Sequence, residues 1–129
     1  MDQLVKQSIR KYSFIFPLRG ISKDNEKIMN RSGRFFLSRK FKDFEEALKG
    51  YFLTSKTEGF KMFSDEDLCV TLNFTFKDKR HCDAFNLPKS VCDSMNGILW
   101  KDDRQIKSGS VEVNYGDKEE IRLEVFNIT

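Results

Sequence analysis

Long hydrophobic runs, cysteine and proline are all scarce in this sequence of 129 residues. No apolar run approaches the roughly 18 to 20 residues that a membrane-spanning helix requires, which excludes a transmembrane helix. Three cysteines, an odd number, do not suit a disulfide framework and fit reduced thiols in a cytoplasm-like compartment. The first residues, MDQLVKQSIRKYSF, lack the apolar stretch and small-residue cleavage site of a secretory signal. These absences predict a cytoplasmic protein without a membrane partner.

The charge content raises the alternative of a disordered chain, and the aromatic residues argue against it. Charged residues make up 33% of the chain and hydrophobic residues 39%. The chain nevertheless contains thirteen phenylalanines, whereas disordered chains are usually poor in aromatic residues. The length suits one core, so we expect a single domain over residues 1–129, with residues 1–11 as a flexible tail.

The net charge of +3 conceals an uneven distribution along the chain. Residues 1–42 contain eleven Lys and Arg against three Asp and Glu, a balance of +8. Residues 43–129 contain twelve against seventeen, a balance of −5. This asymmetry is expected if one surface binds a polyanion while another collects carboxylates. From charge alone, a solvated basic face without a partner is an equally good interpretation.

Hydrophobic periodicity predicts the secondary structure. Aromatic and β-branched runs, several with alternating polarity, predict strands over residues 12–18, 68–76, 105–115 and 119–126. Apolar spacings of three and four predict helices over residues 38–54 and 87–95. Pro88 suits the first turn of the second helix, and Asn96-Gly97 suits its end.

This order of elements predicts an α+β fold, β-α-β-α-β-β, in which two main helices pack on a mixed or antiparallel sheet. The last two strands are expected to pair as an antiparallel hairpin through the turn at residues 115–118. Residues 19–35 are expected to form a polar, basic loop. A loop of this length inside a compact domain is usually functional or mobile.

Four aspartates surround the second predicted helix. Asp83 precedes the helix, Asp93 lies near its end, and Asp102-Asp103 lead into the next strand. If two or three of these carboxylates converge after folding, they form an oxygen-rich site suited to Mg²⁺ or Mn²⁺. Such an ion can activate water for attack on a phosphodiester, and Lys89 could steady a phosphate as a point charge. Because aspartate is common at helix starts and turns, spacing alone leaves a structural interpretation open.

The stretch KRHCDAFNLPKSVCDSMNGILWKDDRQI, residues 79–106, resembles the core of the RusA-like Holliday junction resolvases. That family typically shows Asp-x-Asp-Asn-x-x-Lys, then an Asn-Gly-like helix end, then an aromatic residue followed by Asp-Asp and Gln-Ile or Gln-Val. The matching positions are Asp83, Asn86, Lys89, Asp93, Met95, Asn96, Gly97, Trp100, Asp102, Asp103, Gln105 and Ile106. The basic stretch NRSGRFFLSRKFKDF and the last two strands extend the resemblance to nearly the whole chain from about Tyr12.

The resemblance implies a homodimeric, Mg²⁺-dependent endodeoxyribonuclease, with Mn²⁺ as an alternative cofactor. Such enzymes resolve four-way and other branched DNA in recombination and repair, in a bacterial or phage context. Carried over by position, Asp83 and Asp103 would be catalytic carboxylates and metal ligands, and Asp102 would be a further ligand or its neighbour. Lys89 would be the catalytic lysine. The supporting residues would be Asn86 and Asp93, which would fix the helix and its surroundings.

One position departs from the family pattern. The family's second aspartate, directly before the Asn, is Phe85 in this chain. Phenylalanine cannot coordinate a metal or a water. Three interpretations follow: Asp93 or Asp102 replaces the missing ligand, the metal binds weakly, or the protein binds junctions without cutting them. The alternative to a nuclease is therefore a catalytically impaired relative that binds branched DNA or another partner.

Given the resemblance, two groups of basic residues are expected to bind DNA phosphates. The first lies on the basic loop and the adjoining helix start, and the second lies beside the carboxylates. They are Arg31, Arg34, Arg39, Lys40 and Lys42, and then Lys77, Lys79 and Arg80. A C2 dimer would place two copies of this surface on equivalent strands of a junction. Trp100 is a candidate for stacking on bases at the branch point, and His81 is a candidate general base, although a surface histidine is the simpler interpretation.

Overall fold

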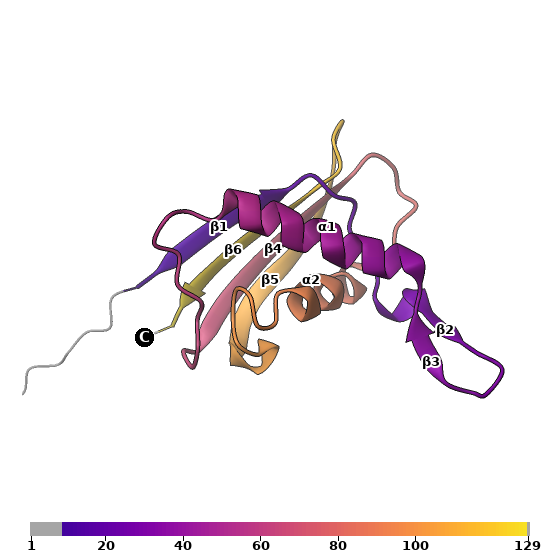
Figure 1. Cartoon of the computed structure of the whole chain (residues 1–129). Coiled ribbons are helices and arrows are strands. Elements are labelled where there is room, and N and C mark those ends of the chain that lie inside the picture. The colour runs from indigo at the N-terminus through magenta and orange to yellow at the C-terminus, as the bar shows by residue number, and fades with distance from the viewer. Residues whose placement is uncertain (1–8, 129) are drawn as a thin grey trace, which may run out of the picture.

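A four-stranded sheet with two helices packed on one of its faces forms the body of the computed structural model (Figure 1), which describes residues 9–128. The strand order is β1-β6-β4-β5. In that order the strands are Lys11–Phe16, Glu120–Asn127, Leu68–Phe76 and Ile106–Tyr115. The two helices are α1, Arg39–Ser55, and α2, Pro88–Ser94. The predicted α+β class, with a mixed sheet and two main helices, is confirmed.

Strand β4 lies inside the sheet and follows the predicted alternation along its whole length. Its odd-numbered residues are half-buried. Its even-numbered residues are buried in the core: Leu68, Val70, Leu72, Phe74 and Phe76. One edge of β4 pairs in parallel with β5, and the other pairs antiparallel with β6. The apolar face of β4 therefore forms the floor on which both helices pack.

The predicted antiparallel hairpin between the last two strands is wrong, because β4 lies between β5 and β6. After Tyr115 the chain crosses the end of β4, where the Gly116 N–H donates to the Phe76 carbonyl (3.0 Å). It then enters the sheet on the other side of β4. A short turn between two strands gives no sign of a third strand inserted from another part of the chain, so local sequence could not show this pairing.

Both helices begin where their sequence predicts and bury the predicted faces. The Ser38 hydroxyl accepts the Phe41 N–H (3.2 Å) at the start of α1, which satisfies one of the free donors of the first turn. The core residues of α1 are Phe41, Phe44, Leu48 and Phe52. Pro88 occupies the first turn of α2, and Leu87, Val91 and Met95 are fully buried against the sheet.

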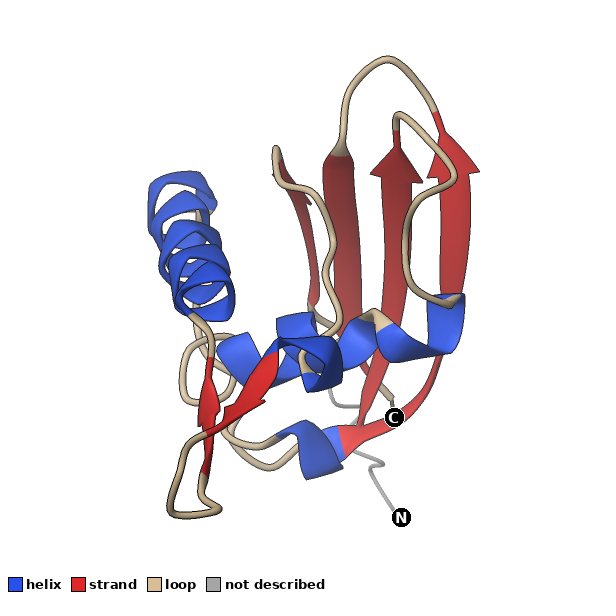
Figure 2. Ribbon diagram, turned by 90° about the vertical axis from the view of Figure 1, so that its right-hand side faces the viewer, coloured by secondary structure: helices blue, strands red, loops and turns tan. Residues whose placement is uncertain are grey.

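The segment predicted as a basic loop contains a short 3₁₀ turn, η1 (Asp24–Glu26), and a small hairpin of strands β2 (Lys27–Met29) and β3 (Phe35–Leu37). The hairpin projects away from the sheet (Figures 1 and 2). Its base is fixed to α1, because the Ser38 hydroxyl donates to the Glu26 carboxylate (2.7 Å) and the Ser38 N–H donates to the Glu26 carbonyl (2.8 Å). Strands of three residues are too short to show a periodicity, so the sequence did not predict them.

The predicted tail lies mainly at residues 1–8, which are outside the described residues. At its end, the Arg10 N–H donates to the Asn127 side chain (2.6 Å) and the Arg10 guanidinium pairs with Glu66. Within residues 9–128, neither helix combines the length and the apolar character needed to cross a membrane.

Gly109 marks a close approach of β5 to β4, and this generates a stability prediction. Its φ is 151°, and a Cβ at this position would overlap the backbone of Val70. We expect Gly109→Ala to lower the free energy of unfolding by roughly 2–4 kcal/mol, because the methyl group must separate the strands or strain the backbone. Denaturation followed by circular dichroism measures the change. Ser110→Ala, on the next residue, should change stability by less than about 0.5 kcal/mol, and equal stabilities of the two variants would contradict the close approach.

Candidate functional site

Several residues that carry the family resemblance hold the chain in shape after α2. The Trp100 ring is fully buried, and its Nε1–H donates to the Asn96 side chain (2.9 Å). Gly97 has a φ of 77°, and its N–H donates to the Trp100 carbonyl (2.7 Å). Trp100 is thus a core residue, and the idea that it stacks on bases is wrong, because no part of the ring reaches the surface.

Asp102 and Gln105 close the next turn as a capping box at η3, Asp103–Gln105. The Asp102 carboxylate accepts the Arg104 N–H (2.9 Å), and the Gln105 side-chain oxygen accepts the Asp102 N–H (3.0 Å). The Arg104 N–H and guanidinium lower the pKa of Asp102. The Asp102 carboxylate, which was predicted to bind a metal, is therefore already engaged in hydrogen bonds that stabilise the turn.

Lys89 and Asp93 lie one turn apart on α2, and consecutive residues of the segment before the hairpin bind both of them. The Lys23 ammonium pairs with Asp93 (2.8 Å), and Lys89 pairs with Asp24 (3.2 Å). Asp24 also pairs with Lys27 (3.0 Å), and hydrogen bonds from Lys27 and then Lys89 lower the pKa of Asp24. These contacts tie the base of the hairpin to the helix that carries the candidate catalytic lysine.

Asp103, which follows α2, interacts with two other carboxylates, Asp93 and Asp102. Burial raises the pKa of Asp103, and hydrogen bonding and repulsion from Asp93 and then Asp102 raise it further. Asp93 was predicted to act as a support, and in the structure it is the neighbour of Asp103. Lys23 offsets the charge of Asp93 and Arg104 offsets that of Asp102, so Asp103 is the carboxylate of the three without an ion pair among the described residues.

Asp83 lies at the other end of α2, immediately before the 3₁₀ turn η2 (Ala84–Asn86). Its exposed carboxylate forms no ion pair or side-chain hydrogen bond with any described residue, and neither does the side chain of Asn86. Across residues 9–128, no group of three or more His, Cys, Asp or Glu side chains is placed to hold a metal ion. The expected convergence of Asp83 with Asp102 and Asp103 is thus not found among these residues: Asp83 precedes α2, whereas Asp102 and Asp103 follow it, and the donor set does not fit a three-ligand metal site.

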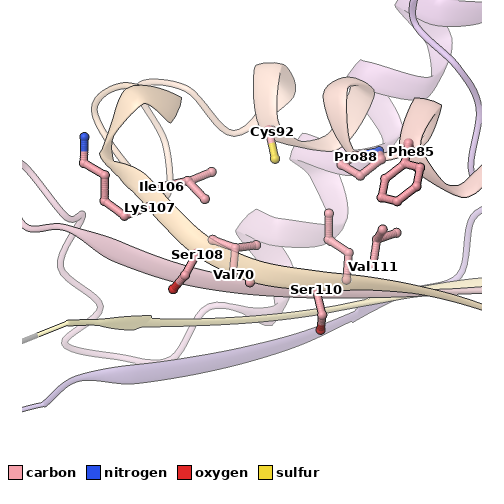
Figure 3. A pocket seen from close by; sticks show the side chains of 11 residues that line it. Val70, Phe85, Pro88, Cys92, Ile106, Lys107, Ser108, Ser110 and Val111 are labelled. Carbon is pink, nitrogen blue, oxygen red and sulfur yellow. The ribbon is translucent and has the colours of Figure 1, made fainter.

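Phe85 lies at a groove of about 380 Å³ between the η2–α2 segment and the outer strand β5 (Figure 3). The side chain is exposed over 89% of its surface, so the ring fills neither a carboxylate cluster nor the core. Apolar side chains dominate the groove: Val70, Leu72, Pro88, Cys92, Ile106 and Val111. Burial, with a smaller contribution from Asp103 and Asp93, raises the pKa of Cys92 to about 12, which keeps its thiol protonated at neutral pH.

A second, polar cavity of about 410 Å³ brings basic residues together from three parts of the chain. Lys40 comes from the first turn of α1, Arg80 from the turn after β4, and Arg19 from the segment after β1. The sequence predicted DNA binding by Lys40 and Arg80. It did not predict a role for Arg19, which gave no signal beyond its charge. Three cations line the cavity against one carboxylate, Glu26. Arg19 is already paired with Glu119 and Asp78, and Lys40 lies 3.8 Å from Glu26, so Arg80 is the lining cation without an ion pair among the described residues and the one most available to a phosphate.

His81 also lines this cavity, and both of its ring nitrogens are engaged. Nε2 lies 2.7 Å from the Tyr115 hydroxyl, and Nδ1 lies 2.8 Å from the Cys82 carbonyl. The ring stacks on Phe76 with 4.3 Å between centroids. These contacts favour a positioned structural histidine over the general base considered from the sequence.

The other predicted DNA-binding residues are exposed around this cavity and on the hairpin. Arg31 and Arg34 belong to the hairpin tip. Arg39 and Lys42 lie on the first turn of α1, and Lys77 and Lys79 follow β4; all four are exposed. Arg39 is paired with Asp43 at 3.2 Å. The fold thus gathers the two predicted basic groups towards one end of the molecule.

A family model described as endodeoxyribonuclease RusA matches residues 17–126, the greater part of the chain. The chain belongs to the RusA endodeoxyribonuclease family. The resemblance predicted from the sequence is confirmed. No curated protein matches the chain.

Membership of the RusA family supports a general function as a Holliday junction endonuclease that acts on branched DNA. RusA nucleases are generally dependent on a divalent metal. The roles of individual residues, Asp83, Lys89 and Asp103 above all, stay predictions.

The contact between Asp93 and Asp103 generates a prediction about protonation. We expect Asp93→Asn to lower the pKa of Asp103, because the substitution removes a neighbouring charge and supplies an amide donor. When folding raises the pKa of a carboxyl group, the folded protein loses stability as the pH rises from the unfolded-state pKa to the folded-state pKa. We therefore expect this loss of stability to be smaller in the variant. Carboxyl NMR titration measures the pKa. Asp117→Asn, in the connection between β5 and β6, is the control, and an unchanged Asp103 pKa in Asp93→Asn would contradict the contact.

Proposed function

We propose that this RusA-family chain binds four-way and other branched DNA and cleaves it as an endodeoxyribonuclease with Mg²⁺ or Mn²⁺ as cofactor. The observation that carries the proposal is the family match over residues 17–126. The basic cavity and the exposed cations around it give DNA binding a physical basis, since phosphate contacts supply most of the affinity for nucleic acid.

A twofold dimer suits this substrate. A four-way junction presents equivalent strands in pairs, so two copies of the basic surface related by a twofold axis would contact equivalent phosphates. Recognition would then depend on branch shape more than on base sequence, because contacts to phosphates carry little sequence information. Resolvases of this kind are usually dimers, which supports the proposal of a homodimer.

For cleavage, we assign Asp83 and Asp103 as the catalytic carboxylates and Lys89 as the residue that steadies the phosphate. Asp83 and Lys89 lie at the N-terminal side of α2, whereas Asp103 lies at its C-terminal side with Asp93. Lys89 is paired with Asp24, and Asp102 is occupied by its turn. The geometry therefore supports DNA binding more directly than it supports cleavage.

This arrangement favours a second candidate function, which is binding of branched DNA without cutting. Phe85 occupies the position of a family carboxylate and is exposed, so it offers neither a ligand nor a charge. The lack of a group of three metal-binding side chains among residues 9–128 also favours binding without cutting. The two candidate functions share the DNA-binding surface and differ only in whether the protein cleaves the bound DNA.

Nicking of a synthetic four-way junction distinguishes the two candidates. We expect slow nicking by the natural chain with Mg²⁺ or Mn²⁺ and none by Asp83→Asn, because that variant removes the carboxylate carried over from the family. We expect Phe85→Asp to increase the rate by about tenfold or more, because it restores a carboxylate two residues from Asp83.

Binding of the same junction without metal is the control for folding and recognition. Nicking by the natural chain that persists in Asp83→Asn would contradict the assigned site. Binding without nicking by the natural chain, with activity only in Phe85→Asp, would establish the second candidate. A natural chain that neither binds nor cuts the junction would overturn both.

The basic cavity generates a prediction about salt dependence. We expect Lys40→Gln and Arg80→Gln each to weaken binding of duplex and branched DNA alike and to reduce the slope of log affinity against log salt by about one. Lys56→Gln, at the opposite end of α1, should leave the slope unchanged. Fluorescence anisotropy over a salt series measures the slopes. Unaltered slopes in Lys40→Gln and Arg80→Gln would show that DNA does not reach the cavity.

A further inference from the structure

The β2–β3 hairpin exposes apolar side chains on both of its faces. Met29 and Phe35 are opposite each other in its register, and 60% and 69% of their surfaces are exposed. Ile28 and Phe36 form the other cross-strand pair, with 44% and 45% exposed. Exposed apolar side chains that cluster within a polar rim mark a binding surface, and no third strand from residues 9–128 covers this hairpin.

Hydrogen bonds within the hairpin stabilise its tip. The Asn30 side-chain oxygen accepts the N–H groups of Ser32 (3.1 Å) and Arg34 (3.0 Å). Gly33, with a φ of 79°, donates its N–H to the Asn30 carbonyl (3.1 Å). A preformed turn reduces the entropy lost when a ligand binds. Arg31 and Arg34 form no ion pair with any described residue, so their charges are available to a partner.

The charge around the exposed rings identifies the class of partner. Residues 27–42 contain six Lys and Arg and no Asp or Glu. Lys27, Arg39 and Lys40 pair with carboxylates just outside this stretch, Asp24, Asp43 and Glu26. The cations without an ion pair among the described residues are Arg31, Arg34 and Lys42. Aromatic rings among cations are the composition of surfaces that bind unpaired nucleic acid, where rings stack on bases and cations neutralise phosphates. Two copies of this hairpin packed together would bring like charges into contact, which disfavours a dimer interface here.

We propose that Phe35 and Phe36 stack on unpaired or unstacked bases at the branch point of DNA, while Arg31 and Arg34 bind the adjoining phosphates. The inference rests on the proposed binding of branched DNA and adds the element that distinguishes a branch from a duplex. Fully paired duplex offers few accessible base faces, whereas a branch point exposes them.

The base of the hairpin is fixed relative to α2 by two ion pairs, Lys23 with Asp93 and Asp24 with Lys89. Bases captured by the hairpin would therefore be held at a set position relative to the candidate catalytic lysine.

The experiment compares the affinity of the full chain for a labelled four-way junction and for a duplex with the same arm sequence, by anisotropy without divalent metal. We expect Phe35→Ala and Phe36→Ala each to lower junction affinity by about tenfold and to leave duplex affinity within about twofold. Phe35→Trp should retain junction affinity, whereas Phe35→Leu should lose it, because leucine keeps apolar volume but has no ring.

Leu53→Ala is the matched control, since Leu53 is an exposed apolar residue on α1 (60%) away from the hairpin. Thermal melting confirms that each variant is folded, and sedimentation velocity reports its oligomeric state. Because 69% of the Phe35 surface is exposed, its substitutions should leave the melting temperature unchanged.

The possible results separate this inference from the proposed function. If the natural chain binds the junction and every hairpin variant binds equally well, the stacking inference is overturned and the proposed function stands. If the variants lose affinity only as they change oligomeric state, the hairpin is a contact between copies and the inference is wrong. If the natural chain binds no branched DNA, the proposed function fails, and the inference fails with it.

Discussion

The buried face of β4 is the constraint on which the rest of the structure depends. Five large apolar side chains of this strand are buried, each contributing on the order of 2 kcal/mol through removal from water. Both edges of the strand are also paired, so its backbone groups are satisfied on each side. Helices α1 and α2 are held where they can cover that face, and this places the start of α1 and the turn after β4 around one basic cavity.

The segment between β1 and α1 links binding to the candidate chemistry. Its two ion pairs with α2 and the hydrogen bonds between Glu26 and Ser38 fix the hairpin to both helices. The cost is that Lys89 is engaged with Asp24 and Asp93 with Lys23. The pair of Lys89 with Asp24 is exposed and therefore weak, so a strong polyanion can compete for Lys89, whereas the pair of Lys23 with Asp93 is mostly buried. In the proposed function, the contact of Lys89 with Asp24 would therefore also affect how readily Lys89 reaches a phosphate.

The family resemblance combines residues of two kinds. Asn96, Gly97, Trp100 and Gln105 hold a buried ring, a left-handed turn and a capping box, so they preserve the shape of the segment after α2. Asp83 has no such role among the described residues, and the contact of Lys89 is with Asp24 before the hairpin, not with the segment after α2. Because a shape-preserving residue can be retained without activity, the match in sequence establishes the family more firmly than it establishes cleavage, and the exposed Phe85 makes that distinction concrete.

The sequence by itself determined the α+β class, the faces of both helices, the alternation of β4 and the family, because periodicity and short motifs are local properties. Tertiary structure alone decided that β4 separates β5 from β6 and that Asp93, rather than Asp83, lies beside Asp103. It also decided that Arg19 joins Lys40 and Arg80 in one cavity, and that Phe35 and Phe36 stay outside the core. These are contacts between distant segments, and their energies depend on which surfaces the whole chain buries, so no local pattern encodes them.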